Sequence, residues 1–198
     1  DTLAIYDLRS GNLEKVSGLK AWKLPVKWSG YLAYTFEPDS LRQAKKKPKG
    51  LPLAIRDLAS GAGRTLNGVG SFELAEEGAT MLLTSTGSDS TFDEGVYHYD
   101  FQAANLQPLL RRSGAYKQLS MDKAGRQVVF LADLDTTKVQ VRPYDLFYWR
   151  SGLDSARQVA GNSSNFLPPD WLISEHGSLQ FSEDGNRLFF GTSPRPLL

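Results

Sequence analysis

The sequence lacks cysteine altogether, which excludes disulfides, zinc–thiolate sites and a cysteine nucleophile. It has only two histidines, His98 and His176, and no pair of histidines shares a strand face or a helical turn, so the pattern does not indicate a metal site. No apolar run reaches the roughly 18 residues that a membrane-spanning helix needs. The net charge is only +1, whereas nucleic acid and acidic membranes require a concentrated positive field. The sequence therefore predicts no metal, no other cofactor, no nucleic-acid partner and no membrane span.

An initiator methionine and a signal peptide are also missing, because the chain begins at Asp1 and Thr2. Such a start is typical of a processed or trimmed product. The remaining composition is that of a folded protein, since 40% of the 198 residues are hydrophobic and 23% are charged. A chain of this length can bury a full hydrophobic core in one or two domains.

Helical patterns are nearly absent as well, because only the stretch 39–47 could form one or two turns. A repeat takes their place. The segment LAIYDLRSG (3–11) returns as LAIRDLASG (53–61) with seven of nine letters unchanged, and looser copies follow as VYHYDFQAAN (96–105) and YDLFYWRSG (144–152). Apolar or aromatic side chains alternate with smaller or polar ones in each copy. This alternation predicts a β-strand that ends in a tight turn.

A short strand follows each copy, and a second repeated pattern then joins a polar turn to an apolar strand. The second pattern occurs at KWSGYLAYTF (27–36), AEEGATMLLTST (75–86), DKAGRQVVFLAD (122–133) and SEDGNRLFFGTS (182–193). The turn glycines of this pattern are Gly30, Gly78, Gly125 and Gly185. We expect them to adopt the positive φ that suits a hairpin turn. A fourth short strand precedes each of these turns.

Four strands in each unit of roughly 40 to 50 residues is the period of a β-propeller blade. We therefore predict an all-β fold, with residues 1–198 forming one β-propeller region of about four four-stranded antiparallel blades. A β-sandwich also spaces its strands evenly, but it does not require quartets with the same turn chemistry. The chain starts at the third strand of a unit and ends after a second strand. These start and end positions within the four-strand unit favour a partial ring over a closed ring of four blades. The open blade edges of a partial ring predict self-association.

Two insertions interrupt the period, near residues 37–52 and 161–177. The lysines of the first insertion are Lys45, Lys46, Lys47 and Lys49. We expect a solvated loop there rather than a basic contact patch. The second insertion carries Phe166 and Trp171 and is too apolar for a free loop, so it should pack on the rim or on a face of the propeller.

Several of these runs resemble the N-terminal propeller region of bacterial prolyl-oligopeptidase-family serine peptidases, most closely the large secreted forms of Bacteroides-like bacteria. The similar runs are LAIYDLRSG, LAIRDLASG, FELAEEGATMLLTST (72–86) and PPDWLISEHGSLQFSEDGNRLFFGTSP (168–194). The resemblance covers essentially the whole chain, and its most specific stretch is 171–192.

The resemblance implies a propeller that gates and orients peptide substrates for a C-terminal α/β-hydrolase domain carrying a Ser-Asp-His triad. In dipeptidyl peptidase IV-like relatives the propeller also lends acidic side chains that hold the peptide N-terminus. The implied location is the periplasm or the secreted fraction. None of the triad transfers to this chain, because the nucleophile elbow requires G-x-S-x-G. The nearest approaches, GNSSN (161–165) and GTSPR (191–195), both lack the final glycine, so the chain is expected to be a part without catalytic residues.

Candidate substrate contacts lie at the end of the second insertion. Glu175 and His176 are adjacent there, and Trp171 precedes them by a few residues. Histidine titrates near neutrality and can bind or transfer protons, although a purely structural loop histidine is the alternative. His98 stands in the middle of a predicted strand, where we expect a packed or solvent-facing side chain.

Other polar and aromatic positions have structural interpretations. The aspartates Asp7, Asp57 and Asp100 recur where a strand meets its turn, and we expect them to cap backbone N–H groups. The tryptophans, which are Trp22, Trp28, Trp149 and Trp171, are expected to fill spaces between blades.

Two loop segments have compositions that ligand sites can have, but neither has the required spacing. The loop 88–95 gathers Asp89, Asp93 and Glu94, but it lacks the spacing of a calcium-binding EF-hand and is interpreted as a solvated turn. The glycine-rich run 61–70 has no G-x-G-x-x-G ahead of a helix, so a phosphate cradle is not indicated.

A function from a different class remains open. A Tol-type or WD-like repeat propeller would act as a scaffold that binds another protein on its face or rim. The similarity over 168–193 favours the peptidase interpretation. A four-bladed carbohydrate-active enzyme is disfavoured, because no convincing pair of carboxylates occupies corresponding blade positions.

Overall fold

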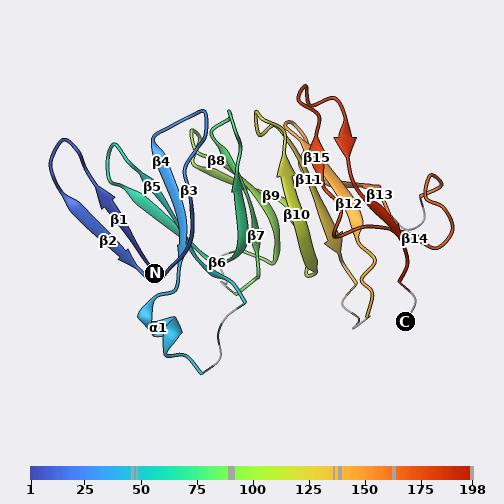
Figure 1. Cartoon of the computed structure of the whole chain (residues 1–198), viewed down its shortest axis with the longest axis horizontal. Coiled ribbons are helices and arrows are strands. Elements are labelled where there is room, and N and C mark those ends of the chain that lie inside the picture. The colour runs from blue at the N-terminus through green and yellow to red at the C-terminus, as the bar shows by residue number, and fades with distance from the viewer. Residues whose placement is uncertain are drawn as a thin grey trace.

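The computed structural model describes residues 1–45, 47, 49–88, 92–135, 137, 140–161 and 164–196. Antiparallel sheets lie side by side along the molecule, from an N-terminal hairpin at one end to the C-terminal strands at the other (Figure 1). In this described part of the chain the only helix is α1 (Asp39–Arg42), inside the stretch that was expected to form one or two turns. The predicted all-β propeller fold is confirmed.

The sheets follow the chain as meanders, and their bounds are as follows. The N-terminal hairpin consists of β1 (Thr2–Tyr6) and β2 (Leu13–Ser17). Blade 1 consists of β3 (Leu19–Lys23), β4 (Tyr31–Phe36), β5 (Leu51–Asp57) and the first half of β6 (Gly63–Leu74). Blade 2 consists of the second half of β6, β7 (Thr80–Ser85), β8 (Gly95–Asp100) and β9 (Asn105–Arg111). Blade 3 consists of β10 (Ala115–Met121), β11 (Gln127–Asp133), β12 (Asp145–Arg150) and β13 (Arg157–Ala160).

The C-terminal part adds two short pairs. The C-terminal hairpin consists of β15 (Gln180–Phe181) and β16 (Leu188–Phe189), and β14 (Trp171–Ile173) pairs with β17 (Thr192–Pro194). Among the described residues, no strand of the N-terminal hairpin pairs with a strand of the C-terminal hairpin. The arrangement is therefore open, with three complete blades between two hairpins.

Blades 1 and 2 share strand β6, which the sequence pattern had divided into two strands. Val69 pairs with Leu51 of β5 and also with Ser85 of β7. Gly68 has a φ of +68° at this point, and a Cβ on Gly70 would lie 2.9 Å from Oγ1 of Thr84. The glycine-rich run therefore lets one strand bend from the outer edge of blade 1 to the inner edge of blade 2.

The recurring aspartates cap their turns as predicted. Oδ1 of Asp7 accepts hydrogen bonds from the backbone N–H groups of Arg9 and Ser10 at 2.9 and 2.6 Å. Asp57 and Asp100 accept the equivalent pairs of bonds in their own turns at 2.8 and 2.9 Å. These bonds hold the pKa of the Asp57 carboxyl below its usual range, because they stabilise the ionised form.

The turn glycines serve two different purposes. Gly30, Gly125 and Gly185 have positive φ values, as expected. Gly78 does not adopt a positive φ, so that part of the prediction was wrong. A Cβ on Gly78 would lie 1.9 Å from the carbonyl oxygen of Ala124 in the next blade. Gly78 is thus required by close packing between blades rather than by turn geometry.

The hydrophobic core lies between the sheets. One cluster joins blades 1 and 2 through residues such as Leu53 and Met81, and another joins blades 2 and 3 through residues such as Leu82 and Phe130. Adjacent residues on one strand therefore enter different clusters, as Met81 and Leu82 do. Strands covered on both faces explain why the inner runs are almost continuously apolar.

The tryptophan prediction is confirmed for two of the four residues. Trp28 donates its indole N–H to the carbonyl oxygen of Ala75 in the next blade at 2.9 Å. Trp149 is buried in the cluster between blades 2 and 3. Trp22 is half exposed instead, and Trp171 is half-buried in β14.

Candidate functional site

The long connections all lie at one end of the sheets. The segments that join the second to the third strand of a blade, or one blade to the next, meet at what we call the loop end. It comprises the described residues 37–45, 47, 49–50, 86–88, 92–94, 134–135, 137, 140–144, 161 and 164–179. The opposite turn end carries the short turns, which comprise residues 7–12, 24–30, 57–62, 75–79, 101–104, 122–126, 151–156 and 182–187. The loop end lies at the bottom of Figure 1, near α1 and both termini. Long loops on a rigid scaffold are where binding residues concentrate.

The described residues of the second insertion, 161 and 164–177, pack against blade 3. Its strand β14 pairs with β17, and Ile173 also forms an isolated bridge with Tyr144. Phe166 meets Phe190 edge to face, with their ring centroids 6.2 Å apart. Ile173 and Tyr144 belong to the third apolar cluster, so the insertion is tied to blade 3.

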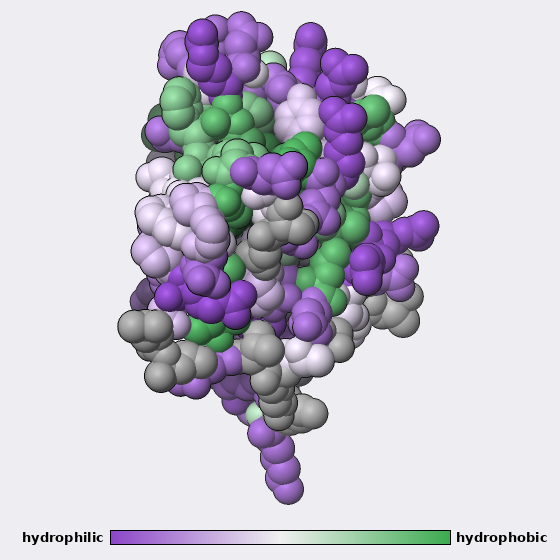
Figure 2. Space-filling model, turned by 90° about the vertical axis from the view of Figure 1, so that its right-hand side faces the viewer, coloured by the Kyte–Doolittle hydropathy of each residue, from purple (hydrophilic) through white to green (hydrophobic). Residues whose placement is uncertain are grey.

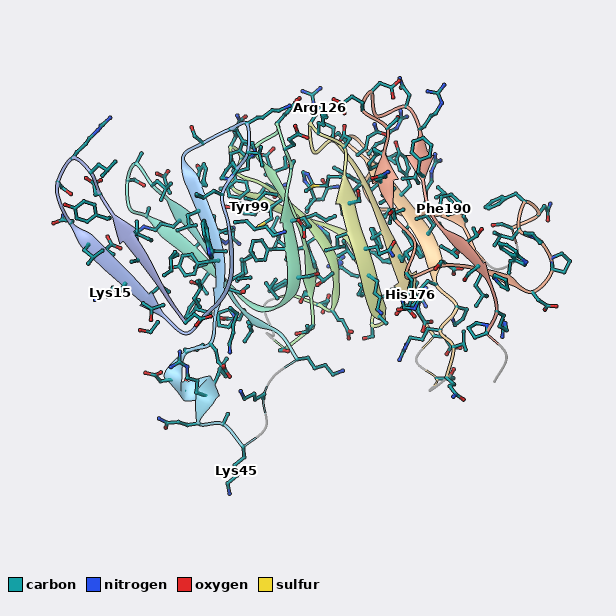
Figure 3. The ribbon with its side chains drawn as sticks, viewed as in Figure 1. Lys15, Lys45, Tyr99, Arg126, His176 and Phe190 are labelled. Carbon is teal, nitrogen blue, oxygen red and sulfur yellow. The ribbon has the colours of Figure 1, made fainter. Side chains whose placement is uncertain are left out.

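Two residues of the inner strand β10 hold the predicted contact residue Glu175. The Lys117 ammonium forms an ion pair with the Glu175 carboxylate. The amide Nε2 of Gln118 donates hydrogen bonds to the backbone oxygens of Glu175 and Gly177, both at 2.6 Å. His176 lies between these anchors and is exposed at the loop end (Figure 3). The structure thus brings Glu175 and His176 onto one anchored turn, while Trp171 is the first residue of β14.

Gln118 itself is held in an unusual conformation. It has a φ of +50°, and the register between β10 and β11 shifts between Lys117 and Ser120. A residue other than glycine in the left-handed region costs about 1 to 3 kcal/mol and persists only where its surroundings require it. Bulges of this kind re-aim side chains next to binding sites. Lys117 and Gln118 could not be predicted from the sequence, because nothing in YKQLSM (116–121) distinguishes it from an ordinary strand.

The charges around this turn are coupled. The Glu175 carboxylate raises the pKa of the Lys117 amine through their hydrogen bond. The Lys117 ammonium also lies 5.9 Å from the centre of the Tyr144 ring. Burial, followed by the nearby Glu175 charge, raises the pKa of the Tyr144 hydroxyl. The turn 174–177 therefore presents an exposed imidazole beside a carboxylate that is already paired.

A polar cavity opens between blades 2 and 3 at the same end. Its volume is about 320 Å³, and the side chains of Lys49, Ser71, Thr84, Glu94 and Tyr116 contribute to its lining. Burial, followed by the Glu94 charge, raises the pKa of Tyr116 to about 12, so this phenol stays protonated. The cavity offers hydroxyls and one charge of each sign, which suits a polar ligand.

The lysine-rich insertion is partly tied down. Lys47 and Lys20 both pair with the buried carboxylate of Glu37, at 2.7 and 2.8 Å. Hydrogen bonds from these two lysines lower the pKa of Glu37 to about 2. Lys45 is exposed and points away from the sheets (Figure 3), whereas Lys46 lies outside the described residues.

The remaining candidates do not form a site. His98 is buried, and its Nε2 donates to the carbonyl oxygen of Gly125 in the next blade at 2.9 Å. Asp93 and Glu94 line different cavities, and Asp89 lies outside the described residues. Within the described ranges, no three histidine or carboxylate side chains gather in a way that could hold a metal ion.

No nucleophile elbow is found in the described part of the chain. Ser193 lies in β17, opposite Leu172, rather than between a strand and a helix. Ser164 accepts a hydrogen bond from the backbone N–H of Gly161 at 2.9 Å, and Ser163 lies outside the described residues. No described helix is long and apolar enough to cross a membrane.

Comparison with known proteins identifies the fold. No protein-family description matches the sequence, and no curated protein matches it. The structure is similar to the β-propeller domain of the Trilobed protease from Pyrococcus furiosus, which has an open velcro topology, with a TM-score of 0.52 and 11% identity over 88% of this chain and 52% of that one. The fold is that of a β-propeller.

Two further solved structures share it. A prolyl endopeptidase matches with a TM-score of 0.52 and 14% identity over 87% of this chain and 25% of that one. An oligogalacturonate lyase in complex with manganese matches with a TM-score of 0.53 and 13% identity over 93% of this chain and 51% of that one. The chain therefore spans from a quarter to about half of the length of these structures.

Proposed function

We propose that this chain is the non-catalytic propeller part of a prolyl-oligopeptidase-like or dipeptidyl-peptidase-like serine peptidase. Its role would be to gate and orient peptides for a C-terminal α/β-hydrolase domain, in a periplasmic or secreted enzyme of Bacteroides-like bacteria. The observation that carries the proposal is the anchored turn 174–177, which presents His176 at the loop end beside the inner strand β10. The similarity in fold to propeller domains of proteases supports it.

The chemistry of the anchored turn fits a peptide. Peptides offer backbone carbonyls that accept hydrogen bonds from an imidazole N–H or an ammonium. His176 is exposed, and the adjacent Glu175 is paired with Lys117. A peptide ammonium that displaced Lys117 from Glu175 would be held by the same carboxylate. Gln118 acts as a positioning residue, because it fixes the turn without facing the peptide.

A protein-binding scaffold of Tol or WD type is the second candidate, favoured by exposed apolar side chains. Leu8 of the N-terminal hairpin is 90% exposed, and Tyr6 beside it is 58% exposed. Figure 2 shows hydrophobic side chains among hydrophilic ones on the opposite side of the molecule. Phe166 and Phe189 of the C-terminal part are exposed as well. Such surfaces mark protein contacts, and they would also support self-association.

Labelling with a fluorophosphonate distinguishes the two candidates. We expect the complete gene product to be labelled on one serine outside this chain and to hydrolyse prolyl- or alanyl-peptide nitroanilides. The isolated chain should show neither reaction. Labelling of any serine within this chain would overturn its non-catalytic assignment, and a complete gene product without a reactive serine would favour the scaffold.

A further inference from the structure

A groove runs along the outer rim between blades 1 and 2. Its volume is about 520 Å³. Arg64 of β6 lies on the blade 1 side, and β8 and β9 of blade 2 supply most of the remaining wall. Its lining residues are Arg64, Phe92, Asp93, Tyr97, Ala104, Asn105, Leu106, Pro108 and Arg111. Neither the anchored turn nor the polar cavity at the loop end shares a residue with this groove.

Two arginines of the groove have no acidic partner among the described residues. The ion pairs of the described chain engage Arg42, Arg56 and Arg142, but neither Arg64 nor Arg111. Arg64 is nevertheless held in place, since its guanidinium lies 5.8 Å from the centre of the Tyr99 ring and contacts the carbonyl oxygen of Ala104 at 3.4 Å. A guanidinium that is held in place without a carboxylate partner is well suited to bind a carboxylate through two parallel hydrogen bonds, that is, in a bidentate geometry.

The two arginines mark opposite ends of the groove. Arg64 contacts Ala104, which immediately precedes β9 at the turn end, whereas Arg111 is the last residue of β9. An extended strand rises about 3.3 Å per residue, so the length of β9 separates the two ends by about 20 Å. Between them the wall includes Leu106 and Pro108, and the ring of Phe92 packs edge-on against Tyr97.

The groove is suited to bind a ligand through its side chains rather than through backbone hydrogen bonds along the edge of β9. Pro108 has no N–H, and the register of β8 and β9 shifts between Val96 and Tyr97, so β9 does not offer a regular free edge. Among the described residues, Asp93 is the one carboxylate that lines the groove, against two guanidinium groups. The described lining therefore carries a net positive charge.

We propose that this groove binds an extended acidic segment of a partner protein. The segment would place two carboxylates about six residues apart, one on Arg64 and one on Arg111, with small intervening side chains against Leu106 and Pro108. This assignment is independent of the peptidase proposal, because it concerns the outer rim and requires no hydrolase domain. Both arginines are exposed, so binding should weaken as ionic strength rises.

A peptide probe tests the assignment on the intact chain. The probe is fluorescein-labelled Glu-Ser-Leu-Thr-Leu-Ser-Glu, and its matched control carries Gln at both ends. Fluorescence anisotropy should show binding of the acidic probe that is at least about 10-fold tighter than that of the control, as two charge-assisted contacts require. Arg64→Gln and Arg111→Gln should each weaken binding by about 5-fold, which corresponds to one exposed ion pair.

Arg157→Gln is the matched control variant. Arg157 is exposed on β13, the outer strand of blade 3, and does not line the groove. The Arg157→Gln substitution removes one positive charge, as the two groove variants do, and should leave binding of the acidic probe unchanged. Thermal unfolding of each variant verifies that the fold is kept. Absence of binding to the acidic probe, equal binding of both probes, or equal loss with all three variants would overturn the proposal.

Discussion

The side-chain amide of Gln118 donates a 2.6 Å hydrogen bond to the backbone carbonyl of Glu175, although the two residues are 57 positions apart in the chain. Through this bond the inner strand β10 fixes the turn that carries His176. The left-handed φ of +50° at Gln118 aims the amide at that turn. The relationship explains why a strained residue occupies the middle of a strand.

Substitution of Gln118 separates its strain from its bonds. Gln118→Ala keeps the left-handed φ but loses both hydrogen bonds, so unfolding free energy should fall by about 1 to 3 kcal/mol. Gln118→Gly loses the same bonds and relieves the strain, so it should be less destabilising than alanine by up to about 1 kcal/mol. Urea denaturation measures both, and a glycine variant less stable than the alanine variant would contradict the role of strain.

His98 should make the stability of the chain depend on pH. Burial lowers the pKa of its imidazole in the folded state, while the Gly125 carbonyl and the carboxylates of Asp100 and Asp122 oppose the shift. Below about pH 6.5 the unfolded chain therefore binds a proton that the folded chain does not. Stability from this site is present above that pH and is lost as pH falls through it.

Thermal melting between about pH 7.5 and pH 5 measures the effect of His98. The wild-type melting temperature should fall more steeply with pH than that of His98→Gln, which cannot titrate. His176→Gln controls for the loss of one histidine at an exposed position. Identical pH profiles for the wild type and His98→Gln would contradict the assignment.

Gly78 tests the close packing of blades 2 and 3. Alanine at this position would place its Cβ 1.9 Å from the carbonyl oxygen of Ala124, so the blades must move apart. We expect Gly78→Ala to cost about 1 to 3 kcal/mol of unfolding free energy, as overpacking does elsewhere. Gly63→Ala is the control, because its Cβ would meet its nearest neighbour at 3.4 Å. Equal stability of the two variants, measured by chemical denaturation, would show that the contact is relaxed at little cost.

The Asp57 turn cap should depend on an acceptor oxygen rather than on charge alone. Asp57→Ala removes the bonds to the N–H groups of Ala59 and Ser60, and should lower the melting temperature. Asp57→Asn keeps an acceptor and should lower it less. The folded-state pKa of Asp57 is depressed, so the cap contributes above the unfolded pKa of 3.8 and is lost as pH falls through the folded value. Differential scanning calorimetry at neutral and acidic pH measures both effects.

The sequence predicts the strands and turns of this fold because their signals are local. Period-two alternation identified the strands of the blades, and Asp57 at the end of its strand identified the cap. The single bent strand β6 and the role of Gly78 escaped, because each depends on backbone from a neighbouring strand or blade. The local sequence pattern does not show which backbone segments, distant along the chain, come into close contact.

The candidate site was predictable only in part. Glu175 and His176 stood out in a long, specific segment, and the structure shows them on one turn at the loop end. Lys117 and Gln118 were missed, since the bulge that aims them arises from strand register rather than from composition. The groove at Arg64 and Arg111 was also missed, because it forms only when two blades lie side by side and no local pattern shows that arrangement.

Kinetics on the complete gene product test most directly whether the loop end serves a peptidase. Glu175→Gln and His176→Ala should lower kcat/KM for prolyl- and alanyl-peptide nitroanilides by about 10-fold, which corresponds to about 1.4 kcal/mol of lost binding in the transition state. The rate of labelling by a small fluorophosphonate should stay unchanged, because the propeller does not form the nucleophile. Peptide hydrolysis that is insensitive to both substitutions, or a gene product with no reactive serine, would contradict the peptidase assignment.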